Sequence, residues 1–144
     1  MGLTKLSICL IALLVTMMVS VSGHAYIIAS YGDAKLDTKK RTNVILVTKG
    51  SELDFNFLYS ARMTAARIKQ VNPEEQVLVI GVEERDDYDK NVKEYRANKF
   101  IIQEHKTNFW NKYIYFKDVL NLLEPYKKIA SLHLFSHSTP QFGA

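Results

Sequence analysis

One run of sequence decides the fold: NVILVT at residues 43–48. It is apolar and β-branched without alternation, and Lys49-Gly50 closes it, which is the pattern of a strand buried on both faces. A second run of this kind, QVLVIGV, lies at 76–82, and a segment with helical periodicity at 54–71 separates the two. Strand, helix and strand in this order predict a parallel βαβ unit over residues 43–82.

The same alternation continues toward the C-terminus. We expect a shorter strand at 99–104, a second amphipathic helix at 113–124 and a third apolar strand at 131–136. The sequence thus predicts a three-layer α/β fold with a mainly parallel sheet, in which the three long apolar strands are adjacent and buried and the two helices cover them. Such a sheet needs further elements to cover it, so we expect the chain to be truncated at its C-terminus.

Two segments are expected to lie at the margin of this sheet. Residues 26–42 begin apolar at Tyr26-Ile27-Ile28 and then become polar, which indicates a short edge strand or an ordered lead-in. The acidic segment 83–89 is expected on the surface, within a hairpin-like insertion that precedes the second helix.

The N-terminus has the three parts of an export signal. Lys5 supplies a positive charge, the apolar run 6–21 follows, and small residues end it at Ser22-Gly23-His24-Ala25. We predict a secretory signal peptide over residues 1–25, cleavage before Tyr26, and a secreted or periplasmic protein. Because the apolar run is shorter than the roughly 20 residues of a bilayer-spanning helix, no stable membrane association is expected after cleavage, and an uncleaved anchor is the alternative.

Cleavage would leave 119 residues, 26–144, enough for a single α/β domain. Its 18 basic and 15 acidic side chains give a net charge of +3, which is too small to indicate nucleic acid as a partner. The only cysteine, Cys9, would be lost, so neither a disulfide nor a cysteine nucleophile is expected. No glycine fingerprint follows Gly81 and no calcium-loop spacing occurs in 83–87, so no cofactor and no metal are expected.

The chemistry-bearing motif is Ser136-His137-Ser138, at the end of the third strand. Catalytic groups gather beyond the carboxyl ends of parallel strands, and a histidine that titrates near neutral pH suits general acid–base work there. A turn beginning near Ser136 would free His137, whereas His133 should point into the packing between sheet and helix. The bland alternative is that the two serines only cap the strand.

The order of elements, ending in Leu134-Phe135-Ser136-His137-Ser138, resembles the first half of the caspase and gingipain-like cysteine peptidases. In that family an apolar third strand ends in a small residue, the catalytic histidine and usually a glycine. The resemblance implies that His137 is this histidine, that Ser138 stands in the glycine position, and that the substrate is a peptide or protein. It also implies a nucleophilic cysteine on the next strand, so the 144-residue chain should be inactive.

Two other interpretations stay open. In the first, Ser138 is the nucleophile of a serine α/β-hydrolase, an esterase or lipase, although Ser136 and Pro140 then replace both glycines of the nucleophile elbow. Only six residues follow Ser138, too few to supply an acid and a base. In the second, the chain is a non-catalytic secreted domain that binds a partner through its strand-end loops.

Overall fold

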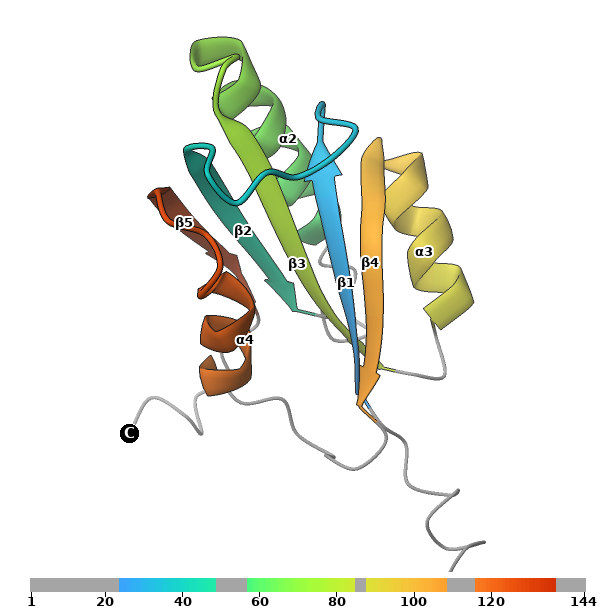
Figure 1. The fold of residues 1–144 in the computed structure, drawn as a ribbon. Helices are drawn as coiled ribbons and strands as arrows, with labels where there is room; N and C mark the ends of the chain where they lie inside the picture. Colours follow the sequence, from blue (N-terminus) through green and yellow to red (C-terminus); the bar gives the residue numbers. More distant parts are fainter. Residues whose placement is uncertain (1–23, 49–56, 85–87, 109–115, 137–144) are drawn as a thin grey trace, which may run out of the picture.

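The computed structural model describes residues 24–48, 57–84, 88–108 and 116–136, which form one sheet and three helices (Figure 1). In chain order the elements are β1 (His24–Tyr31), β2 (Thr42–Thr48), α2 (Phe57–Val71), β3 (Gln76–Glu84), α3 (Tyr88–Ala97), β4 (Phe100–Asn108), α4 (Phe116–Leu123) and β5 (Ile129–Phe135). The predicted α/β class is confirmed.

The five strands lie in the order β4-β1-β3-β2-β5. β2 pairs in parallel with β3 and with β5, so that Val44 lies opposite both Leu78 and Leu132. The prediction that the three apolar strands are adjacent and parallel is therefore confirmed. β1, however, runs antiparallel to both of its neighbours, β3 and β4. Two of the four pairings are antiparallel, so the sheet is mixed rather than mainly parallel.

Helices cover both faces of the sheet and give the three layers that the sequence predicts (Figure 1). α2 and α3 pack on one face, around a core of Ile27, Ala29, Ile45, Val47, Leu58, Ala61, Ala65, Val77, Val79, Val92, Tyr95 and Phe100. α4 lies on the other face, where Val119 packs with Tyr26, Val44, Leu46, Leu78 and Ile80. Successive residues of β2 alternate between these two clusters because neighbouring side chains of a strand point to opposite faces.

The expectation of an edge strand or lead-in at 26–42 was wrong in one respect. β1 is an interior strand between β3 and β4, and only residues 32–41 form a loop. Ile27, Ala29 and Ser30 are fully buried, since both faces and both sides of the strand are covered. An apolar run followed by small residues fits such a position, but the partners that enclose it come later in the chain.

The expectation that the third apolar strand is buried on both faces was also wrong. β5 lies at the end of the described sheet, and its side chains alternate between partly buried and exposed. Leu132 and Leu134 are 49% and 58% exposed, because α4 packs through Val119 onto β2 and β3 and leaves this face of β5 uncovered.

A helix and a longer strand replace the hairpin-like insertion. β3 continues to Glu84, so the acidic segment begins inside the sheet, and α3 then leads into β4. α3 is polar apart from Val92 and Tyr95, three residues apart, which bury against the sheet. Gly81 makes this packing possible, because a β-carbon there would overlap the Tyr95 hydroxyl. The described parts of the other two helices lie within the predicted 54–71 and 113–124.

Candidate functional site

β2 is the strand at which the winding of the chain reverses. The crossover from β2 to β3 passes through α2 on one face, whereas the path to β5, on the other side of β2, passes through α4 on the opposite face. The two connections run in opposite directions along the sheet and on opposite faces of it, so both crossovers have the same handedness. This agrees with the strong preference for right-handed crossovers. Ligand sites in open α/β sheets lie at such a switch point, outside the carboxyl ends of the strands. The candidate site is therefore the edge formed by the ends of β2 and β5.

The two strands end side by side at this edge. Thr48 at the end of β2 donates a hydrogen bond from Oγ1 to the carbonyl oxygen of Phe135, at 3.4 Å. β5 ends at Phe135, as the predicted break near Ser136 requires, and Ser136 is exposed. His137, Ser138 and the loop after β2, residues 49–56, lie outside the described residues.

The same edge receives the beginning of β1. His24 pairs in register with Glu84 of β3 and with Asn108 of β4, the last residues of those strands. The segment that contains the predicted cleavage site thus enters the sheet at the edge where His137 follows β5. Tyr26, the predicted first residue of the mature protein, is 7% exposed.

His133 occupies a different place, in the middle of β5. Its Nε2 lies 3.1 Å from Oγ of Ser131, two residues earlier on the same face. Phe135, on that face too, packs against the core beneath α2. The prediction that His133 points into the packing between sheet and helix agrees with this arrangement, and its ring nitrogen has a partner within the strand.

His133 belongs to a chain of polar contacts that joins β5 and β2 to the turn just before β3. Ser131 donates from Oγ to Oδ1 of Asn43, at 2.6 Å, and Asn43 donates from Nδ2 to Oε2 of Glu75, at 2.7 Å. Because the single hydroxyl proton of Ser131 goes to Asn43, His133 must donate its Nε2 proton to Ser131. A histidine that donates cannot accept the serine proton, so this pair does not form an activated nucleophile. The chain fastens β5 to β2 and β3.

Glu75 is the charged end of this polar chain. Its side chain is held by Asn43 and by Nε of Arg41, which lies 2.6 Å from Oε1. The hydrogen bond from Asn43 and the nearby guanidinium hold the pKa of the Glu75 carboxyl below its ordinary value, although burial opposes them. Sequence reasoning missed this network, since its members lie at or just before the starts of three separate strands and show no shared spacing.

The loop 32–41 is anchored by a buried glutamine. Gln76, fully buried at the start of β3, accepts a hydrogen bond from the backbone N–H of Asp37 and donates to the Asp37 carbonyl, at 2.9 and 2.6 Å. Its second amide proton goes to Oγ1 of Thr42, at 2.7 Å. At the other end of the loop, Nζ of Lys69 forms an ion pair with Asp33, at 2.8 Å. These contacts fix one wall of a groove on the α4 face.

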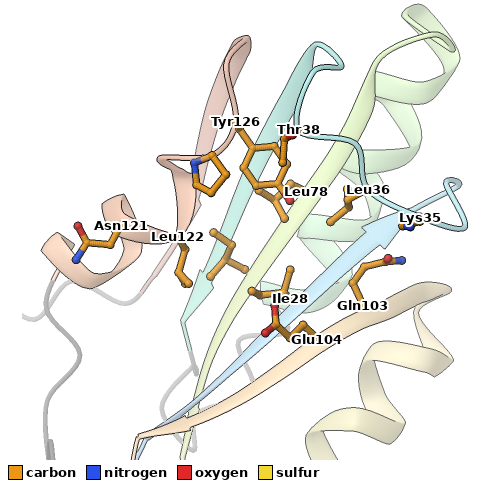
Figure 2. Close-up of a pocket in the computed structure, with 12 residues that line it drawn as sticks. Ile28, Lys35, Leu36, Thr38, Leu78, Gln103, Glu104, Asn121, Leu122 and Tyr126 are labelled. Atoms are coloured by element: carbon orange, nitrogen blue, oxygen red, sulfur yellow. The ribbon is translucent and has the colours of Figure 1, made fainter.

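That groove is lined by none of the residues at the carboxyl edge of β2 and β5 (Figure 2). It has a volume of about 330 Å³ and lies between α4, the loop 32–41 and β4. Its apolar lining residues are Ile28, Leu36, Leu78, Ile80, Leu122 and Pro125, and its polar ones are Lys35, Thr38, Gln103, Glu104, Asn121 and Tyr126. No local sequence pattern indicates this groove, because five separate segments contribute to it.

Within the described ranges, no group of three or more histidine, cysteine, aspartate or glutamate side chains is placed to hold a metal ion. None of the three described helices is long and apolar enough to cross a membrane. The chain matches no protein-family model, no curated protein and no solved structure.

Proposed function

We propose that this chain is part of an exported, caspase-like hydrolase, a cysteine peptidase whose general acid–base is His137 and whose cysteine is encoded beyond Ala144. The observation that carries the proposal is the switch point between β2 and β5, since His137 is the second residue after the end of β5. A histidine at this edge suits general acid–base work on a group that the neighbouring loops hold.

The open side of β5 supports the second half of the proposal. Leu132 and Leu134 expose about half of their surface on the α4 face, and no described strand pairs with the outer side of β5. A further parallel strand could pair with this side of β5 and would end at the same edge, and the helix leading to it could cover the two leucines. A cysteine at the end of that strand would then lie on the same edge as His137.

In this mechanism His137 takes the proton of the cysteine thiol, and the thiolate attacks the peptide carbonyl. His137 then returns a proton to the departing amine. The chain as given contains only Cys9, inside the segment that we expect to be removed. The 144-residue chain should therefore show no peptidase activity.

The test is a product extended through the reading frame downstream of Ala144, assayed for peptidase activity that a thiol-alkylating reagent blocks. His137→Ala should lower kcat by about 10²- to 10⁴-fold, which is the usual contribution of general acid–base assistance. The matched control is His133→Ala, which alters the structural histidine of the same strand and should leave kcat unchanged.

The remaining outcomes decide between the alternatives. If Ser138→Ala abolished the activity and His137→Ala only weakened it, the serine nucleophile would replace the cysteine proposal. If the extended product had no hydrolase activity, the Ser136-His137-Ser138 segment would be a strand cap in a secreted binding domain. Export itself is tested by mass spectrometry of secreted or periplasmic material, for which we expect Tyr26 as the N-terminal residue.

A further inference from the structure

The groove on the α4 face has preformed walls. On the loop side, Gln76 holds Asp37, and the backbone N–H of Lys127 donates to the carbonyl of Thr38, at 3.1 Å, which ties the loop to the segment after α4. The floor is the apolar surface of β1 and β3, at Ile28, Leu78 and Ile80. A cavity of about 330 Å³ with an apolar floor and few polar groups is at the small end of sites for small molecules.

A β-bulge in β4 directs two successive side chains into this groove. Ile28 pairs with Glu104 and Ala29 pairs with Ile102, so Gln103 is an extra residue in β4. Both Gln103 and Glu104 consequently line the groove, where a regular strand would turn one of them to the α3 face. Bulges that re-aim a side chain are common beside binding sites.

The two residues of the bulge have different roles. Gln103 donates from Nε2 to Oγ of Ser30, at 2.9 Å, and to the carbonyl of Ala34, at 3.0 Å, and so supports the loop. Glu104 brings the only carboxylate of the lining. Figure 2 shows it beside Ile28, at the side of the groove that β4 forms, whereas Lys35 lies at the end formed by the loop.

Glu104 also affects Tyr126, the aromatic residue of the groove wall. Tyr126 lines the groove, and burial together with the Glu104 carboxylate raises the pKa of its phenol. The groove thus combines an apolar floor, a negative charge and an aromatic ring. This combination favours a cation with an apolar body, because a carboxylate attracts the charge, and the floor and the aromatic wall remove the body from water.

We propose that this groove binds a small amphipathic cation, with its ammonium or guanidinium group against Glu104 and its aliphatic part on Ile28, Leu78 and Ile80, toward the wall that Tyr126 forms. A ligand anion would be repelled by Glu104, and a neutral apolar ligand would gain no attraction from its charge. The site is independent of the hydrolase proposal, since no residue at the carboxyl edge contributes to it.

The experiment titrates the full 144-residue chain with hexylammonium and follows the methyl NMR signals of Ile28, Ile80 and Leu122. We expect saturable shifts of these signals with hexylammonium, weakening as salt is raised, and at least tenfold weaker binding of hexanol, its neutral counterpart. Glu104→Gln should weaken hexylammonium binding about tenfold, because the charge-assisted contact becomes a neutral one.

Two further variants keep the result interpretable. Glu94→Gln, on the exposed side of α3 across the sheet, should leave the affinity unchanged. Tyr126→Leu keeps an apolar wall without the ring and should weaken binding about two- to fivefold. The proposal is overturned if hexanol binds as tightly as hexylammonium, if Glu104→Gln retains full affinity in a chain with unchanged thermal unfolding, or if no groove methyl signal shifts.

Discussion

The two outermost strands of the described sheet, β4 and β5, meet solvent in different ways. β4 has a bulge at Gln103 and carries Glu104 and Lys106, and Phe100 at its start is 3% exposed beneath α3. From Ser131 to Phe135, β5 contains no charged residue and no proline, and it exposes two leucines. Bulges and charges are the devices by which proteins prevent edge strands from pairing further. The difference indicates that β4 is protected against pairing with a further strand and that the described part of β5 is not.

The first way to test this comparison is to remove one apolar side chain from each edge. Phe100 packs against Tyr95 and Tyr31, with ring centroids 5.8 Å apart in both pairs. Phe100→Ala should lower the free energy of unfolding by about 3–5 kcal/mol, whereas Leu134→Ala should change it by about 0.5 kcal/mol or less. Urea denaturation of both variants measures this. Equal losses would show that β5 is as well packed as β4.

The second concerns self-association of the 144-residue chain. An exposed apolar edge strand without charges is a template for pairing with another chain, so we expect association that depends on concentration. Leu134→Lys should weaken this association about tenfold or more, because it places a like charge at the pairing edge of every copy. Ile101→Lys, at a β4 residue that is 40% exposed, is the matched control and should have no effect. Sedimentation of the parent and the two variants over a range of concentrations measures the association. An equal effect of both lysines on the association would contradict the comparison.

The third concerns the polar chain that ties β5 to its neighbours. The pKa of Glu75 is lowered in the folded state from its ordinary value of 4.5, so its contribution to stability is present above that pH and is lost as pH falls through the folded pKa. Glu75→Gln should therefore be less stable than the parent at neutral pH, and the difference should shrink under acid conditions. Thermal unfolding at a series of pH values measures it, with Glu94→Gln as the exposed control. A difference that stays constant with pH would exclude Glu75 as its source.

The interior of the sheet was predictable from sequence because its strands are apolar at every position. The runs at 43–48 and 76–82 are buried on both faces as predicted, and the spacing of Leu58, Ala61 and Ala65 placed α2 correctly. α3 was missed because its buried apolar side chains, among the residues whose burial is described, are only Val92 and Tyr95, too few for a periodic signal. The exposure of β5 could not be predicted, since its residues are as apolar as those of a buried strand and only the sheet order shows that it lies outermost.

Of the candidate sites, too, one could be predicted from the sequence and the others could not. The position of the carboxyl edge follows from strand order and direction, which repeated βαβ patterns predict. The groove and the Glu75–Asn43–Ser131 chain depend on a bulge, a loop anchor and contacts between residues far apart in sequence. No local pattern carries information of that kind.

The place of β1 in the sheet also bears on when the protein can fold. β1 is the first described strand in the chain. Its two neighbours in the sheet, β3 and β4, are synthesised only after β2 and α2. Neither side of β1 can close until synthesis has reached Gln76, and the second waits until Phe100. Contacts between segments so far apart in sequence slow the folding reaction. If the chain is exported as we propose, a first strand that stays unpaired until late in synthesis would give time for its delivery, still unfolded, to an export channel.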